Sequence, residues 1–131
     1  MTALLLDTSA YAAFKRGHPE AVTALRTAPM ILLPIVVLGE LLAGFEAGNR
    51  REKNREELQS FLQSGRVRLA SHGEGTAERY ALIYAYLRKN GRPIPTNDLW
   101  IAASAMEHGV RLLTADAHFL NLPQILIDFL S

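Results

Sequence analysis

The chain has 131 residues, of which 49% are hydrophobic and 21% are charged, and its formal net charge is +1 at pH 7. This length fits a single domain, residues 1–131, and the composition excludes the disordered, collagen-like and coiled-coil classes. A charge so close to zero excludes a strong global field for nucleic acid or membrane, so any site for a polyanion has to be local.

Cysteine is absent, which excludes disulfides, thiolate zinc sites and cysteine nucleophiles and makes the cytoplasm the expected compartment. The most apolar stretch, 30–38, is far shorter than the roughly 20 residues of a membrane helix, and Pro34 interrupts it. The opening MTALLLD has no basic region and reaches Asp7 after a few apolar residues, so we expect no secretory signal peptide. We therefore expect no membrane segment.

Short apolar runs alternate with helical patterns along the chain. The runs typical of strands cover 3–6, 30–33, 67–69, 110–113 and 125–129. The helical patterns between them cover 8–14, 18–28, 36–47, 50–64, 76–90 and 96–108. Glycines at 65, 91 and 109 end the last three of these helices, and two prolines, Pro93 and Pro95, enforce a loop.

Apolar spacing also predicts which sides of these helices are buried. We expect 36–47 to be a buried helix and 96–108, which is apolar nearly all round, to lie in the interior. The inward residues of the two remaining long helices are Leu58, Phe61 and Leu62 in one, and Tyr80, Ala81, Tyr84 and Leu87 in the other.

Strands that alternate with helices, and that are apolar throughout rather than at every second residue, indicate a parallel sheet covered on both faces. The predicted fold is therefore an α/β three-layer sandwich with a central, mainly parallel sheet. In such folds ligands bind beyond the carboxyl ends of the strands, so the residues there are the candidates for a site.

Four carboxylates occupy places where this architecture puts a site. Asp7 follows the first strand, Asp116 follows a late strand, and Asp98 opens the interior helix. Glu40 lies in the middle of an apolar helix, where a lone buried carboxylate is costly unless it is paired or binds a metal ion. Its own helix face carries mostly small residues, Val36, Ala43, Gly44 and Ala47, which would leave space above it.

Carboxylates that converge repel one another, and a hard divalent cation relieves the repulsion. Ligation by oxygen without cysteine or clustered histidine favours Mg²⁺ or Mn²⁺ over Zn²⁺. Such a site suits the hydrolysis of a phosphodiester, because the ion activates a water and stabilises charge on the phosphoryl oxygens.

Each aspartate also has an ordinary structural explanation: Asp7 as a helix cap, Asp116 in a turn, and Asp98 in the first turn of a helix. Taken singly, these explanations are favoured. Capping alone does not require Asp7 or Asp98, because we expect Thr8 or Ser9 to be able to cap the first helix, and Thr96 or Asn97 the later one. Glu40 has the weakest structural explanation.

Other polar residues carry weaker signals. The four histidines, at 18, 72, 108 and 118, lack the spacing of metal ligands and are expected to be structural or exposed, with His108 in the last turn of a helix. The basic run 50–55 is interleaved with glutamates and is expected to be a solvated helix face. Arg88, Lys89 and Arg92 precede the proline loop that leads to Asp98, and contact with a nucleic-acid backbone is left open for them.

The residues that several other enzyme classes require are absent from the sequence. The chain has no glycine-rich dinucleotide fingerprint, no P-loop and no G-x-S-x-G elbow. An aspartyl phosphatase of the D-x-D type needs an aspartate where this chain has Ser9, and a phosphorelay receiver needs paired acids where it has Asp7 alone.

Four segments resemble, in order, the acidic segments of PIN domains, and in particular of the VapC toxins of toxin–antitoxin pairs. They are LLLDTSAY at 4–11, PIVVLGELLAGF at 34–45, NDLWIAASAMEHG at 97–109 and LLTADAHF at 112–119. The resemblance spans nearly the whole chain, and the four segments together are far more specific than any one of them.

The resemblance implies catalytic, metal-binding acids at Asp7, Glu40, Asp98 and Asp116, a supporting hydroxyl at Thr114, and a further hydroxyl near the first acid at Ser9. It also implies Mg²⁺- or Mn²⁺-dependent endonucleolytic cleavage of RNA, often tRNA or ribosomal RNA. The implied partners are a VapB-like antitoxin, whose C-terminal segment wraps the toxin, and a second copy of the chain in a homodimer. The alternatives are a PIN-like domain that binds RNA or protein without cutting, and a structure-specific DNA nuclease.

Overall fold

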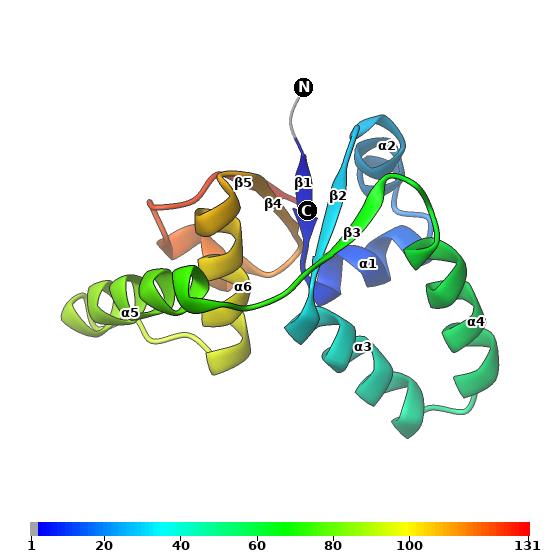
Figure 1. Ribbon diagram of the computed structural model, residues 1–131, viewed down its shortest axis with the longest axis horizontal. Helices are drawn as coiled ribbons and strands as arrows, with labels where there is room; N and C mark the ends of the chain where they lie inside the picture. The colour runs from blue at the N-terminus through cyan, green and yellow to red at the C-terminus, as the bar shows by residue number, and fades with distance from the viewer. Residues whose placement is uncertain (1–2) are drawn as a thin grey trace.

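The computed structural model describes residues 3–131, which contain a five-stranded parallel sheet with helices on both faces (Figure 1). The strands are β1 (Leu4–Leu6), β2 (Ile31–Pro34), β3 (Val67–Ala70), β4 (Arg111–Thr114) and β5 (Ile127–Phe129). They are arranged in the order β3-β2-β1-β4-β5, and each neighbouring pair is parallel. The predicted α/β three-layer sandwich is therefore confirmed; Met1 and Thr2 of the expected domain lie outside the described residues.

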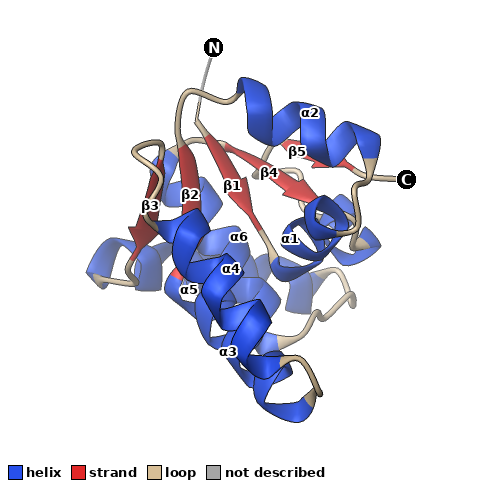
Figure 2. Ribbon diagram, turned by 90° about the vertical axis from the view of Figure 1, so that its right-hand side faces the viewer, coloured by secondary structure: helices blue, strands red, loops and turns tan. Residues whose placement is uncertain are grey.

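The helices are α1 (Thr8–Lys15), α2 (Pro19–Thr27), α3 (Ile35–Ala47), α4 (Arg51–Leu62), α5 (Glu74–Lys89) and α6 (Thr96–His108), with a short 3₁₀ helix η1 (Ala117–Asn121). From β1 in the middle of the sheet the chain adds β2 and then β3 toward one edge, and it then crosses back to place β4 on the other side of β1. Because crossovers between parallel strands are right-handed, this reversal puts α1 to α4 on one side and α5 and α6 on the other. Figure 2 looks at the side of α1 to α4, with the strands behind them in order from β3 to β5.

The middle of the sheet forms the core. Leu5 and Leu6 of β1 and Leu112 and Leu113 of β4 are all buried, as expected for strands covered on both faces. Helix α6 packs beside them and buries Leu99 together with every residue from 101 to 105, so the expectation of an interior helix is confirmed. Gly109 ends α6 in the left-handed conformation, with φ of 63°. Within residues 3–131 no helix has the length and apolar character needed to cross a bilayer.

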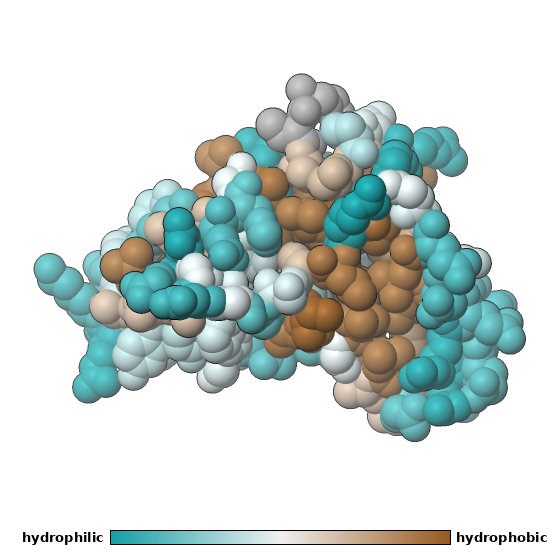
Figure 3. Space-filling view, viewed as in Figure 1, coloured by the Kyte–Doolittle hydropathy of each residue, from teal (hydrophilic) through white to brown (hydrophobic). Residues whose placement is uncertain are grey.

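The expectation that 36–47 is a buried helix is wrong. Only Val37 and Leu41 of α3 are buried, while Ile35 at its start is 43% exposed. The reason is geometric, because α3 continues past the end of β2 and only one side of it can face the rest of the fold (Figure 1). Apolar residues consequently gather on the surface over α3 and the adjoining end of the sheet (Figure 3).

The inward face predicted for α5 is also partly wrong. The helix buries Thr76, Ile83 and Leu87, whereas Ala81 and Tyr84 are exposed. Thr76 turns inward because its hydroxyl donates to Glu107 Oε1 of α6 at 2.5 Å and accepts from the Gly73 amide at 3.0 Å. A count of apolar side chains misses such a residue. In α4 the expected inward residues are confirmed, with Leu58 buried and Phe61 and Leu62 packed against the core.

Candidate active site

The carboxylates from the four acidic segments come to the carboxyl ends of the two central strands. Asp7 directly follows β1, and Asp116 lies two residues beyond the end of β4. These ends are adjacent because Leu6 and Leu113 are paired in the sheet. Asp98 lies in the first turn of α6 and Glu40 in the second turn of α3. We refer to these four residues as the carboxylate cluster.

Asp7 is the most buried member of the cluster, with only 4% of its surface exposed. It is the N-cap of α1 and accepts a hydrogen bond from the Ala10 amide at 2.8 Å, which confirms its structural explanation as a helix cap; neither Thr8 nor Ser9 takes that place. Burial raises the pKa of Asp7, and the charge of Asp116 raises it further. Hydrogen bonds from Thr114, Ser9 and Ala10 lower the pKa and offset part of this rise.

Two hydroxyls connect Asp7 to the loop that carries Asp116. Thr114 Oγ1 donates to Asp7 Oδ2 at 2.6 Å and accepts from the Asp116 amide at 2.9 Å. Ser9 Oγ donates to the Asp7 carboxylate at 2.8 Å and accepts from the Ala115 amide at 2.9 Å. Each hydroxyl therefore joins the Asp7 side chain to one backbone N–H of the loop, which sets the position of Asp116 relative to Asp7.

Glu40 lies at a junction of three helices and is half-buried, so the premise that its carboxylate is buried among apolar residues is wrong. Thr8 Oγ1 of α1 donates to Glu40 Oε1 at 2.5 Å, and Asn97 Nδ2 of α6 donates to Glu40 Oε2 at 3.1 Å. The space expected over the small residues on its face is present at Gly44, where an added Cβ would meet no atom within 4 Å. Neither Thr8 nor Asn97 was predicted to contact it, because both contacts join segments far apart in the sequence.

Asp98, Asp116 and His118 form the tightest group at the site. One ligand atom from each lies within 4.8 Å of the others, and His118 Nδ1 is 3.4 Å from Asp98 Oδ2 and 3.2 Å from Asp116 Oδ1. Burial raises the pKa of Asp98; His118 lowers it, and the charges of Asp116 and Glu40 raise it. Asp116 lies near enough to Asp7 and Asp98 for its charge to raise the pKa of both, and Glu40 lies near enough to Asp98 to raise its pKa.

His118 is exposed, as expected, but its position beside Asp98 and Asp116 was not predicted. The Asp116 side chain caps η1 by accepting from the His118 amide at 2.9 Å, and this turn brings the imidazole back over the carboxylate. An Asp-x-His spacing directly after a strand is the signal that could have indicated it. Asp98 lies in the first turn of α6 as expected, but Pro95 occupies the N-cap, so neither Thr96 nor Asn97 caps this helix.

The cluster lacks a basic counterpart. Across residues 3–131, no lysine or arginine forms a salt bridge with any of its four carboxylates, and His118 is the single partner of opposite potential charge. Oxygen donors that carry excess negative charge are the donor set that Mg²⁺ and Mn²⁺ prefer. The residues present therefore fit a hard divalent cation.

The basic residues lie elsewhere. Arg51 and Arg55 of α4 pair with Glu46, and Arg51 also pairs with Glu52, all on exposed surface, so the solvated helix face expected for the run 50–55 is confirmed. Arg88 and Lys89 end α5, and Arg92 follows in the loop; all three are exposed. Two of the other histidines have structural settings: His72 stacks on Trp100, and His108 lies in the last turn of α6 as expected.

Comparison with known proteins gives consistent matches along the chain. The family model described as PIN domain matches residues 4–124. Ribonuclease VapC4 of Mycobacterium tuberculosis is 32% identical over 91 residues, which are 70% of each chain.

Solved structures agree with this match. A member of the VapBC family of toxin–antitoxin systems, VapBC-5 from Mycobacterium tuberculosis, aligns with 26% identity and a TM-score of 0.79, covering 98% of this chain and 99% of the other. VapBC2 from Rickettsia felis, bound to a DNA fragment from the promoter, aligns with a TM-score of 0.88 and 23% identity over 99% of this chain and 100% of the other. The second likeness shows the fold alone.

Proposed function

Since the chain belongs to the PIN domain family, we propose that it is a metal-dependent endoribonuclease and the toxin of a toxin–antitoxin pair. The relative named Ribonuclease VapC4 supports the reaction, and the likeness to a VapBC complex supports the pairing. The observation that carries the proposal is the gathering of four carboxylates at the carboxyl ends of β1 and β4, with no lysine or arginine partner among residues 3–131.

We assign metal binding to Asp98 and Asp116, with Asp7 and Glu40 completing the site. His118 is within reach of the same ion. Asp7 receives three hydrogen bonds, from the Ala10 amide and the hydroxyls of Ser9 and Thr114. A carboxylate has about four acceptor positions, so one remains for a cation or its water. The oxygen-rich donor set favours Mg²⁺ or Mn²⁺.

The chain's own residues hold the carboxylates in place. Thr8 and Asn97 each donate to one oxygen of Glu40, which restricts its rotation and leaves the remaining lone pairs free for a ligand. Thr114 and Ser9 hold Asp7 and the Asp116 loop at a constant separation. When bound, a divalent ion supplies Lewis-acid charge for the phosphoryl oxygens and activates water for attack on phosphorus.

The antitoxin of such a pair needs a surface on the toxin. The apolar surface over α3 in Figure 3, where Ile35 is 43% exposed, supports docking of a partner, because apolar patches of this kind mark interaction sites. A VapB-like antitoxin is the partner we assign. We also propose that residues 1–131 act as one domain, that the protein forms a homodimer in the cytoplasm, and that its target is tRNA or ribosomal RNA.

The test is to offer RNA and DNA side by side to the purified, antitoxin-free protein, with Mg²⁺ or Mn²⁺ and with a chelator. We expect discrete RNA fragments with metal, none with chelator, and intact DNA. Cleavage of DNA in preference to RNA would favour a structure-specific DNA nuclease. Tight RNA binding with no cleavage under any condition would favour a domain that binds without cutting.

A further inference from the structure

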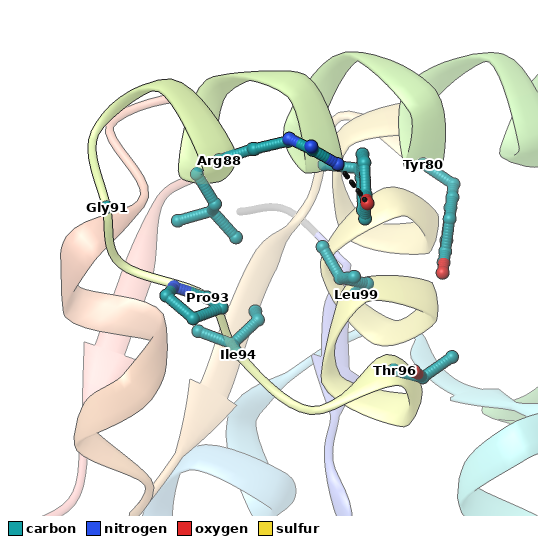
Figure 4. A pocket seen from close by; sticks show the side chains of 9 residues that line it. Tyr80, Arg88, Gly91, Pro93, Ile94, Thr96 and Leu99 are labelled. Carbon is teal, nitrogen blue, oxygen red and sulfur yellow. Dashed lines mark hydrogen bonds between the residues drawn. The ribbon is translucent and has the colours of Figure 1, made fainter.

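A cavity of about 280 Å³ lies between α5, the loop 90–95 and the first turn of α6 (Figure 4). Its volume is just below the range of about 300–1,000 Å³ for small-molecule sites, which leaves room for one planar group rather than for a whole nucleotide. Figure 4 shows Arg88 and Tyr80 of α5 facing Pro93, Ile94 and Thr96 across the opening. The residues that line it are Tyr80, Tyr84, Leu87, Arg88, Gly91, Pro93, Ile94, Thr96 and Leu99.

Two tyrosine rings line one wall of the cavity, and two further rings, those of Trp100 and His72, lie next to them outside the cavity. Tyr80 and Tyr84 are nearly parallel, at 9° with centroids 6.5 Å apart, and Tyr84 is 47% exposed. Tyr80 is 4.4 Å from Trp100, which stacks at 5.2 Å on His72. Exposed aromatic planes beside an apolar slot are the surfaces on which unpaired bases stack.

One basic residue, Arg88, lines the cavity. Arg88 Nη1 donates to the Tyr84 hydroxyl at 3.2 Å, which holds a cation at the edge of the ring. Lys89 and Arg92 are exposed and follow Arg88 in sequence but do not line the cavity, and Arg92 donates to Asn121 Oδ1 at 2.9 Å. In the part of the chain that the structure describes, Arg88 has no carboxylate partner. A flat apolar slot with positive charge at its edge is complementary to a base that is joined to phosphates on both sides.

The cavity also lies close to the carboxylate cluster. Thr96 and Leu99, which line it, flank Asp98 in the first turn of α6. Because a helix with its side chains is about 10 Å across, the cavity and the Asp98 carboxylate are separated by roughly the width of one helix. A single RNA strand can pass over the start of α6 and reach both.

We propose that this cavity binds one unpaired nucleobase of the RNA substrate, stacked on Tyr84, with Arg88 on the adjacent phosphate, and that it contributes to the choice of cleavage site. The role in choosing the cleavage site rests on the proposed ribonuclease function. The binding of an unpaired base by Tyr84 can be measured without cleavage.

The experiment measures binding of a single-stranded oligoribonucleotide of mixed sequence carrying one 2-aminopurine, in chelator, by its fluorescence. Tyr84→Ala is expected to weaken binding about five- to 150-fold, the range for loss of one base–aromatic stack, and Tyr84→Phe to retain most of it. Leu82→Ala is the matched control, since Leu82 lies on the same helix, is 61% exposed and does not line the cavity. Leu82→Ala should bind as the wild type does.

Cleavage mapping on the same variants separates this inference from the proposed function. Fragments whose positions change in Tyr84→Ala, with metal dependence retained, support the cavity as a specificity site. Binding and fragments identical to those of the wild type would overturn the inference and leave the ribonuclease proposal intact. Binding that depends on Tyr84, in a protein that cuts no RNA, would support the cavity and contradict the ribonuclease. A change from dimer to monomer in Tyr84→Ala, without any change in RNA binding, would overturn it by making this face an interface between copies.

Discussion

Replacing Thr114 with valine tests the connection between Asp7 and Asp116. The substitution keeps the shape of a fully buried side chain but removes its hydroxyl, and with it the 2.6 Å bond to Asp7 Oδ2 and the 2.9 Å bond from the Asp116 amide. A hydrogen bond to a charged group contributes about 1.5–3 kcal/mol, so we expect the unfolding free energy to fall by roughly that amount. Loss of groups that orient metal ligands typically costs about 10–100-fold in metal affinity or activity.

Thr76→Val is the matched control for this substitution. Thr76 is equally buried, and its hydroxyl also bridges a carboxylate, that of Glu107, and a backbone N–H, that of Gly73. Both variants should lose similar stability in chemical denaturation. Only Thr114→Val should also lose RNA cleavage and metal affinity, because Thr114, unlike Thr76, contacts the carboxylate cluster.

The comparison has a clear negative result. If Thr114→Val and Thr76→Val lose the same stability and retain the same cleavage rate and metal affinity, the hydroxyl is structural and does not position Asp116. The metal affinity is measured by calorimetry and the cleavage rate on one RNA, both under conditions in which each variant is fully folded.

Three further outcomes are expected. Asp98→Asn should melt a few degrees higher than the wild type in chelator, since the raised pKa of Asp98 shows that its ionised form is disfavoured in the fold. The folded wild type keeps a proton on Asp98 above the ordinary pKa of 3.8, so it loses stability as pH rises from 3.8 through the raised pKa. The stability advantage of Asp98→Asn over the wild type should therefore grow over this pH range, and an advantage that shrinks would contradict this sign. Mg²⁺ or Mn²⁺ at about 100 times its Kd should stabilise the wild type by about 2.7 kcal/mol in denaturant titrations, and equal stabilisation of Asp98→Asn would be contrary evidence. Asp128→Asn breaks an exposed pair with Arg111 at 2.6 Å, so denaturation should show a change below about 1 kcal/mol with cleavage unaltered, and a larger loss would mean that the pair is structural.

The position of the candidate site could be predicted because it depends on the parallel sheet. Asp7 directly follows one apolar run and Asp116 comes shortly after another, so both lie at the carboxyl edge, and the pairing of β1 with β4 brings them together. The prediction needed only the order of strands and acids. It did not need the path of any loop.

The contacts that complete the site could not be predicted in the same way. Thr8 and Asn97 approach Glu40 across 32 and 57 residues of sequence, and their approach depends on how α1, α3 and α6 pack. His118 reaches Asp98 only because Asp116 caps η1 and turns the chain. None of these contacts leaves a pattern in hydrophobic periodicity.

The errors in burial have a related cause. A hydrophobic pattern shows which residues are apolar but not what covers them, so α3 was expected to be buried although the described fold covers only one of its sides. In α5 a threonine takes an inward position that the pattern assigned to apolar residues. Burial of a helix depends on its neighbours, and on a partner chain where one docks.

The central claim is that the carboxylate cluster holds a divalent cation with which the protein cuts RNA. The most direct measurement incubates wild type and Asp98→Asn, both antitoxin-free, with total tRNA and ribosomal RNA in Mg²⁺ or Mn²⁺ and in chelator. We expect discrete fragments from the wild type with metal and from neither protein otherwise. Metal-dependent cleavage by Asp98→Asn at the wild-type rate would contradict the claim.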